Sequence, residues 1–462
     1  MLLLHISDIH FRAPNCTSPD FDPDRPYRTR MIRDVHTRRA TLGPVEAILV
    51  GGDIAFKADP EEYKAASAWL TELAEAAGCS LARVFVVPGN HDVDRNMSAN
   101  SPPTSNAQSA IKQASHPARE GTLRRQFTYP ETGRALLAPL EAYNDFAKLF
   151  NCQVYSPDRL YWKQDLPLGG DVKLRIHGLT STLLSGVNGQ DDTRESLYLS
   201  PLQTVLDPVE NAVNLVLCHH PPEWFMDHDD IHDAITGRAA VHLFGHRHRQ
   251  RITIASTYIR FDAGAVNPDR NESGWKPAYN FIRLEVEGSG AERFLNIEAH
   301  LLEWQSSPEL YRAAIAHNGE DMHRHRIAIP GRTLAMTTIS RTTRDMVVAS
   351  MVAPLDAELD VEAVMSNECT RNLVFRFWNL TISQRREIAF SLGLIEQNEL
   401  SLPDPERYGR ALRRAGERDL LDELARKIKE VENSHSYSYQ RRGYQERRTR
   451  APTNIQQLLP TQ

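Results

Sequence analysis

Apolar residues in the first 302 positions come in short, strand-length runs that loops and helical stretches separate. Several runs are apolar throughout, as buried strands are. Segments 61–77 and 134–150 instead carry apolar residues at three- and four-residue spacing, which predicts helices between the strands. This alternation is the order expected of an α/β domain. The strand candidates are 2–7, 46–50, 83–87, 173–177, 213–217, 240–244, 258–262, 281–285 and 295–300.

Two segments follow neither periodicity. Residues 96–129 are rich in Ser, Pro, Asn and Ala. We expect a loop insertion there, because long segments of this kind are usually lids or disordered. Residues 303–359 are ambiguous, with a short helix over 308–316 and then Thr-, Ser- and Arg-rich sequence. We interpret them as a linker that follows a catalytic domain of residues 1–302.

From residue 360 to 433 the pattern is purely helical. Thr381 and Gln384 form a capping box, and Gly393 follows at a position that can end the helix. We expect a module of three or four helices. A later charged helix carries one apolar stripe, formed by Leu421, Leu424, Ile428 and Val431.

The C-terminal residues 434–462 show no apolar period, and we expect a basic, disordered tail. Tyr437, Tyr439 and Tyr444 alternate there with arginines. Such a composition suits contact with single-stranded nucleic acid. Charged ends are common in proteins, however, so the tail is weak support for that function.

Length and composition narrow the class of protein. The chain has 462 residues, 41% of them hydrophobic and 25% charged, which indicates about two or three globular domains. No apolar stretch approaches the roughly 18 to 20 residues of a membrane span, and the N-terminus lacks signal-peptide features. Five cysteines without a Cys-x-x-Cys pair predict no disulfide framework and favour the cytoplasm. A net charge of −6 gives no global sign of polyanion binding.

Side chains of metal-ligand type follow five of the apolar runs. In open α/β sheets, the edge where strands end is where ligand sites form. Each motif alone is more often an ordinary polar feature than a site, but five of them in order strongly favour a functional centre. The motifs are Asp8-Ile9-His10, Gly51-Gly52-Asp53, Gly89-Asn90-His91-Asp92, Cys218-His219-His220-Pro221-Pro222 and Gly245-His246-Arg247-His248.

These residues can supply two mixed nitrogen and oxygen coordination spheres. Carboxylates such as Asp8 and Asp53 neutralise divalent charge, and imidazoles select first-row transition metals over calcium or magnesium. No thiolate cluster indicates a structural zinc site. Two metals about 3.5 to 4 Å apart can polarise a phosphoryl group and acidify a bridging water. The candidate imidazoles are those of His10, His219, His246 and His248.

Other polar and aromatic residues near the motifs have simpler explanations. His5 and His242 lie inside strand candidates, and we interpret them as packed structural residues. Residues 224–226, which are Trp, Phe and Met, fit a substrate pocket, although core packing is the more common explanation for such a cluster.

In this order, D-x-H, GGD, GNHD, HHPP and GH-x-H resemble the signature of the calcineurin-like metallophosphoesterase superfamily, over roughly residues 1–302. Residues 52–63 and the HHPP form are most similar to the class III cyclic-nucleotide phosphodiesterase branch. The resemblance implies a four-layer α/β/β/α sandwich. It also implies hydrolysis of a phosphodiester or phosphomonoester through a metal-bridging hydroxide, with two divalent ions of manganese, iron or zinc.

The resemblance further implies roles for individual residues. Asp53 would bridge the two ions and share in catalysis. His91 is the candidate general acid, with Asp92 or Asp94 orienting it, while simple termination of a loop explains the two aspartates equally well. His220 would support the ligands or face the substrate, because the family's ligand stands two residues before the proline. The implied ligands are Asp8, His10, Asp53 and His248 on one ion, and Asp53, Asn90, His219 and His246 on the other.

The helical module resembles the effector-associated or death-like adaptor domains of bacterial conflict systems, over residues 375–431. The resemblance implies that a protein partner recruits the phosphoesterase through residues 360–433. A helical cap on the catalytic domain and a dimerisation bundle are the alternatives.

The leading interpretation is therefore a cytoplasmic dimetal phosphoesterase with a phosphate-ester substrate and no membrane partner. The alternative is a metal-dependent nuclease effector, in which arginines of segments 11–44 and 96–129 hold nucleic acid. We modestly favour pairing of these arginines with nearby aspartates. A scaffolding protein with a vestigial site is disfavoured, because the ligand set is intact.

Overall fold

The computed structural model of the chain describes two compact units, which lie within Met1–Thr337 and Thr338–Gln462. The predicted tail, most of the predicted linker and Thr381 of the predicted capping box lie outside the described residues. A helix long and apolar enough to cross a membrane is absent from the described part of the chain. The described residues are 1–155, 159–207, 209, 211–270, 276–289, 292–316, 318–329, 373–374, 376–378, 380, 382–396, 399 and 404–431.

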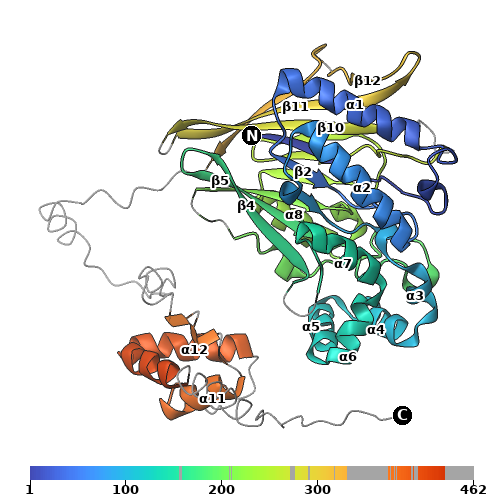
Figure 1. The fold of residues 1–462 in the computed structure, drawn as a ribbon. Helices are drawn as coiled ribbons and strands as arrows, with labels where there is room; N and C mark the ends of the chain where they lie inside the picture. Colours follow the sequence, from blue (N-terminus) through green and yellow to red (C-terminus); the bar gives the residue numbers. More distant parts are fainter. Residues whose placement is uncertain are drawn as a thin grey trace, which may run out of the picture. The chain divides into compact units, whose positions relative to one another are not determined.

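The first unit contains two β-sheets (Figure 1). The strands of the first sheet are β1 (Leu2–Ile6), β2 (Ala47–Val50), β3 (Val84–Val86), β10 (Ala278–Ser289), β11 (Glu292–Ser306), β12 (Glu309–Ala313) and β13 (His323–Ile329). Among the described residues their order is β12-β11-β10-β1-β2-β3, with β13 also paired to β11. β1, β2 and β3 run parallel, so their carboxyl ends meet at one edge.

The second sheet is built in the same way. Its strands are β4 (Tyr161–Gly169), β5 (Val172–Leu179), β6 (Ala212–Cys218), β7 (Val241–Phe244), β8 (Arg251–Ile254) and β9 (Ile259–Asp262). Their order is β4-β5-β6-β7-β9-β8 in the described chain. β5, β6, β7 and β9 are parallel. Each predicted strand falls on a strand of one of the two sheets.

Helices complete the α/β fold that the sequence predicts. α1 (Arg25–Leu42) and α2 (Pro60–Ala77) lie side by side along the first sheet (Figure 1), and α8 (His228–Arg238) precedes β7. A capping box of Asp59 and Glu62 begins α2. The helix predicted over 134–150 is instead divided between α6 (Pro130–Leu137), α7 (Glu141–Ala147) and short 3₁₀ turns. Pro139 lies at this division, where a continuous helix would lack a backbone donor.

The loop insertion predicted over 96–129 is wrong, because this segment is helical. It forms α3 (Arg95–Asn100), α4 (Pro102–Gln113) and α5 (His116–Thr128). Pro at the first turn of α4 and of α5 suits a helix start, where no backbone donor is needed. The buried residues of these helices are few and mostly polar, which explains the missing apolar period. They include Thr104, Ala107, Gln108, Ile111 and Leu123.

The short helix predicted over 308–316 is also wrong, because the segment forms the strand β12. β12 pairs antiparallel with β11, and the Tyr311 ring packs 5.4 Å from the Trp304 ring, centroid to centroid. Burial of Tyr311 and pairing with β11 outweigh the weak helical pattern here. With β13, the first sheet continues to Ile329, beyond the residue at which the sequence pattern suggests the end of the catalytic domain.

The second unit is helical, as predicted. Its described residues form α11 (Ile382–Ser391), α12 (Asp404–Glu417) and helical segments at 373–374, 376–378 and 421–431. Leu424 and Ile428 of the predicted apolar stripe are fully buried in its core. The other buried core residues include Phe377, Ile388, Ala389, Tyr408, Ala411 and Ala415.

Candidate metal centre

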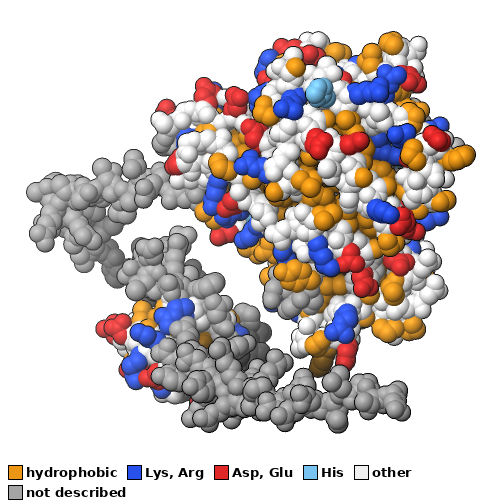
Figure 2. Space-filling model, viewed as in Figure 1, with side chains coloured by type: hydrophobic (Ala, Val, Ile, Leu, Met, Phe, Trp, Pro, Cys, Tyr) orange, Lys and Arg blue, Asp and Glu red, His pale blue; other side chains and the backbone are white. Residues whose placement is uncertain are grey.

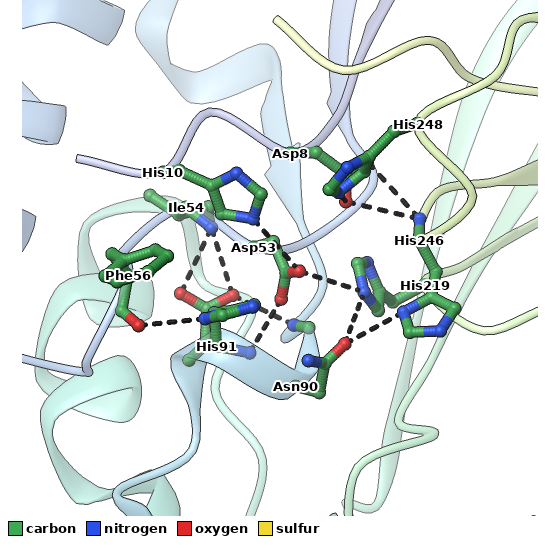
Figure 3. A network of polar contacts seen from close by, with 12 residues as sticks. Asp8, His10, Asp53, Ile54, Phe56, Asn90, His91, His219, His246 and His248 are labelled. Carbon is green, nitrogen blue, oxygen red and sulfur yellow. Dashed lines mark hydrogen bonds and ion pairs between the residues drawn. The ribbon is translucent and has the colours of Figure 1, made fainter. Parts of the chain in front are cut away.

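The carboxyl ends of parallel strands bring the predicted ligands together. Asp8 and Asp53 follow β1 and β2 of the first sheet, and His219 and His246 follow β6 and β7 of the second. Figure 3 shows side chains from both sheets pointing toward one another. The residues gathered there are Asp8, His10, Asp53, Asn90, His219, His246 and His248.

One group of potential ligands surrounds Asp8. His10 Nε2 lies 3.3 Å from Asp53 Oδ2, and His248 Nε2 lies 3.3 Å from Asp8 Oδ1. One ligand atom from each of these four residues lies within 4.8 Å of the others. Two carboxylates and two imidazoles at this spacing form a donor set that fits a divalent transition metal.

A second group lies on the other side of Asp53. The same atom, Asp53 Oδ2, is 3.4 Å from His219 Nε2. Asn90 Oδ1 lies 3.1 Å from His219 Nε2 and 2.9 Å from His246 Nδ1. Asp53 Oδ2 therefore faces an imidazole of each group, which is the position that a bridging carboxylate requires.

Backbone conformation at the site is unusual. Asp8, His10, Asp53, His246 and His248 all have positive φ, between 50° and 68°. Side-chain-bearing residues rarely adopt this region, and strained residues of this kind cluster at functional sites. The left-handed backbone turns these side chains inward at the ends of their strands.

Close backbone approach explains the glycine before Asn90. A Cβ at position 89 would lie 2.1 Å from Asp53 Oδ1 and 2.3 Å from the Asp53 backbone nitrogen. No side chain can fit at that distance. Gly89 therefore allows the loop after β3 to pack against the loop after β2.

Backbone carbonyls orient two of the imidazoles. His219 Nδ1 lies 2.8 Å from the Gly51 carbonyl oxygen, and His10 Nδ1 lies 3.2 Å from that of Asn267. With its proton on Nδ1, each imidazole has a lone pair on Nε2 that can bind a metal ion. The sequence pattern gave no sign of Asn267, because its contribution comes from its backbone and any residue type has one.

The charge states suit cation binding. Burial opposes ionisation of Asp53, but His219 and His91 outweigh it and hold the pKa of Asp53 well below its usual range. Burial lowers the pKa of His246 to about 3, so this imidazole is neutral. Despite burial, Asp53 raises the pKa of His219 to about 9. A divalent cation that binds here takes the place of that proton, as is usual for histidine ligands.

His91 lies beside the two groups but faces them differently. Its backbone N–H donates to Asp53 Oδ1 at 2.8 Å, and its Nδ1 lies 2.9 Å from the Phe56 carbonyl oxygen. The imidazole stacks on the Phe56 ring, with centroids 4.9 Å apart, and packs 4.9 Å from the His10 ring. His91 Nδ1 therefore donates its hydrogen bond to the Phe56 carbonyl, and Nε2 is the ring nitrogen that can contact a substrate.

The prediction that Asp92 or Asp94 orients His91 is wrong. The Asp92 carboxylate accepts hydrogen bonds from backbone N–H groups of Ile54, Ala55 and Gly89. Asp94 caps α3 by accepting from the N–H groups of residues 96 and 97. Both carboxylates thus bond to backbone N–H groups, and it is the Phe56 carbonyl that faces His91 Nδ1 and orients the ring.

His220 packs against His219 and His246, and one ligand atom from each of the three lies within 4.8 Å of the others. It is fully buried, and its ring lies 4.7 Å from the His219 ring and 4.4 Å from the His246 ring. Its Nδ1 lies 2.9 Å from Ser181 Oγ, and its Nε2 lies 3.8 Å from Asp192 Oδ2. Ser181 and Asp192 are in a loop after β5 that carries no motif, so sequence reasoning missed them.

His5, His242 and Phe225 agree with their simpler explanations, and Trp224 does not. His242 Nε2 lies 2.9 Å from the Ala239 carbonyl oxygen, and His5 Nδ1 lies 3.2 Å from Asn280 Nδ2. Both histidines are buried structural residues, as expected. Phe225 is buried in the core, whereas Trp224 is half-buried beside the His246 ring.

Several arginines of the N-terminal segment are paired. Arg28 bonds to Asp22, and Arg38 Nε lies 2.7 Å from Asp34 Oδ2, as the favoured interpretation predicts. Arg12 lies over the Phe56 ring and 3.7 Å from Asp269. Figure 2 shows basic and acidic side chains interspersed on the visible face of the first unit.

Comparison with protein families gives two matches. The family model described as calcineurin-like phosphoesterase matches residues 1–250. The one described as GTPase-associated adaptor domain matches residues 369–430. The search of curated proteins found no match.

Solved structures similar to this chain include Vps29 of Chaetomium thermophilum, with 10% identity over 71% of this chain and 100% of that one, and a TM-score of 0.27. A predicted phosphoesterase of Streptococcus pneumoniae has 11% identity over 70% and 97%, and a TM-score of 0.26. A putative 5′-nucleotidase of Staphylococcus aureus has 12% identity over 80% and 64%, and a TM-score of 0.31.

Proposed function

Because the chain belongs to the calcineurin-like phosphoesterase family, which makes it a metal-dependent hydrolase of phosphate esters, we propose that it works with two divalent metal ions. The observation that carries this proposal is the position of Asp53 Oδ2, 3.3 Å from His10 Nε2 and 3.4 Å from His219 Nε2. A carboxylate oxygen between two imidazoles of different groups suits a bridging ligand. The substrate is a phosphodiester or a phosphomonoester.

Asp53 would be shared between the two ions. Asp8, His10, Asp53 and His248 would hold one ion, and Asp53, Asn90, His219 and His246 would hold the other. Nitrogen and oxygen donors without thiolate suit manganese, iron or zinc. When bound, such a pair supplies Lewis acidity to the phosphoryl group and lowers the pKa of bound water.

His91 protonates the leaving group in this proposal. The Phe56 carbonyl and the stacked Phe56 ring hold the imidazole in one orientation, with Nε2 free. Because Nδ1 donates its hydrogen bond to the Phe56 carbonyl, the acid is the imidazolium form, whose second proton on Nε2 can pass to the departing alkoxide, and this is the role of a general acid. Asp53 meanwhile accepts from the His91 backbone N–H, which fixes the acid relative to the carboxylate.

The proposal is tested by assaying protein loaded with Mn²⁺ on bis-p-nitrophenyl phosphate, p-nitrophenyl phosphate, cyclic nucleotides, and single- and double-stranded nucleic acid. Asp53→Asn should abolish hydrolysis of whichever substrate is cleaved. Asp165→Asn is the matched control, because Asp165 pairs with Arg175 on the strands β4 and β5 and touches no ligand residue. Equal activity in Asp53→Asn and wild type would exclude the dimetal assignment.

We also propose that residues 360–433 bind a protein partner, with residues 434–462 a basic tail after them. The match to an adaptor-domain family over residues 369–430 supports this function, as does a separate core around Phe377 and Tyr408. Expression of residues 360–433 alone tests it. A cooperative unfolding transition is expected of a transferable module, whereas an unfolded product would favour a helical cap that depends on the catalytic domain.

The nuclease alternative gains no support from the paired arginines Arg28 and Arg38. The nucleic-acid substrates in the assay above test it directly.

A further inference from the structure

The loop after β5 packs against residues 224–226, and Trp224 of that segment lies beside His246. A single parallel bridge between Leu197 and Phe225 joins this loop to the segment after the HHPP motif. The Leu197 N–H donates to the Trp224 carbonyl at 3.1 Å, and the Met226 N–H donates to the Leu197 carbonyl at 2.8 Å. These backbone contacts hold the side chains of the two segments in a fixed relation.

Trp224 lies between this loop and the candidate metal centre. Its indole ring meets the His246 imidazole edge-on, with centroids 4.7 Å apart and planes at 78°. The guanidinium of Arg194, from the loop after β5, lies 5.5 Å from the indole centroid. The positive charge of Arg194 is therefore one aromatic ring away from a candidate ligand.

Arg194 differs from the other guanidinium at this indole. Arg247 lies 5.7 Å from the same ring, but it bonds to Glu223 and lies 3.9 Å from Asp262. Arg194 is exposed, and no carboxylate among the described residues lies within ion-pair distance of it. Asp191, nearby in the same loop, already pairs with Arg95. Arg194 thus presents an unneutralised charge beside the site.

Building on the proposed phosphoesterase activity, we propose that Arg194 binds a second phosphate of the substrate, next to the phosphate that is cleaved. A guanidinium matches phosphate with two parallel hydrogen bonds. Contact with the indole limits its motion, so less entropy is lost when the anion binds. The substrate is accordingly a phosphate ester that carries a further phosphate, as in a nucleoside polyphosphate or an oligonucleotide.

Two substrates that differ only in that phosphate test the inference. Thymidine 5′-(p-nitrophenyl phosphate) has one phosphate, and its 3′-phosphorylated form has two. Wild type should show the lower KM for the form with two. We define the KM ratio as KM for the one-phosphate form divided by KM for the two-phosphate form. Arg194→Gln should reduce this ratio by about tenfold, the usual effect of losing a hydrogen bond to a charged group. Arg194→Lys should restore part of the ratio, because it keeps the charge without the planar fork.

Arg324→Gln, at an exposed position on β13, is the matched control and should leave the ratio as in wild type. Adenosine diphosphate and a short oligothymidylate then separate the two sources of a second phosphate, since the true class will be the one whose KM depends on Arg194. A wild-type ratio of one, or an equal KM change on both thymidine substrates in Arg194→Gln, would overturn the inference. Failure of the proposed function looks different, since wild type would then cleave neither substrate.

Discussion

The carboxylate of Asp92 accepts a hydrogen bond from the backbone N–H of Ala55 at 2.9 Å, which joins the loop after β3 to the loop after β2. Asp92 also accepts from the Gly89 N–H at 2.9 Å and from the Tyr63 hydroxyl at 3.0 Å. One buried side chain thus holds together the loops that supply Asp53 and the ligands next to it. Asp92 contributes to the site by holding these loops in place.

Replacement of Asp92 by Ala should therefore destabilise the first unit. Each backbone N–H left buried without a partner costs about 1 to 3 kcal/mol, and several lose their acceptor together. We expect a loss of about 3 kcal/mol or more in the free energy of unfolding, measured by urea denaturation. Asp94→Ala is the control, since it removes a helix cap on α3 worth about 1 kcal/mol. Equal losses in the two variants would contradict this role for Asp92.

Gly89→Ala should weaken metal binding. The new Cβ would fall 2.1 Å from Asp53 Oδ1 and 2.3 Å from the Asp53 backbone nitrogen, so the loop that carries Asp53 has to move. Isothermal titration with Mn²⁺ should show weaker binding, and hydrolysis should fall with it. At Gly237, in α8, a Cβ would meet nothing within 4 Å, so Gly237→Ala controls for the added methyl group. Unchanged Mn²⁺ affinity in Gly89→Ala would show that the loop can relax.

His91→Ala should slow hydrolysis in proportion to the basicity of the leaving group. An alkoxide needs a proton as it departs, whereas p-nitrophenolate leaves without one. We expect kcat for an alkyl ester to fall by about a hundredfold or more, and kcat for a p-nitrophenyl ester to fall much less. Phe56→Leu, which removes the stacked ring but keeps the carbonyl, should have a smaller effect of the same kind. A uniform loss on both esters would rule out the acid role.

The sequence predicted strands whose side chains are buried on both faces of the sheet. β1 and β2 are buried at every position and were recognisable as apolar runs. The strands β4, β8, β12 and β13 were missed, because they lie at sheet edges where only part of each strand is covered. The helices α4 and α5 were missed because few of their residues are buried and half of those are polar.

At the site, local sequence was informative wherever a side chain follows its own strand. Asp8 and Asp53 could be found because each stands directly after an apolar run. Arg194 and Ser181 could not, because they act across a loop contact that only the folded chain creates. The positive φ of Asp8 likewise depends on the surrounding fold, since no rule of residue type predicts it.

The second unit contains its own buried charge. Glu399 is only 3% exposed, and both of its carboxylate oxygens bond to the Arg414 guanidinium, at 2.8 and 2.9 Å. Glu399 Oε2 also accepts from the Glu396 N–H at 3.0 Å. These hydrogen bonds, those from Arg414 above all, lower the pKa of Glu399 to about 2. The segment before α12 is thereby tied to the helix itself.

Glu399→Gln should lower the stability of α12 at neutral pH and have little effect in acid. Because the folded-state pKa of Glu399 lies below its usual 4.5, its contribution is complete above pH 4.5 and disappears as the pH falls toward 2. Protection factors from hydrogen exchange of α12 peptides in the full chain should differ between variant and wild type at pH 7 and converge at low pH. Glu423→Gln, at an exposed pair with Arg426, should change protection little at either pH. A difference that persists unchanged at low pH would mean that the glutamine disturbs packing rather than charge.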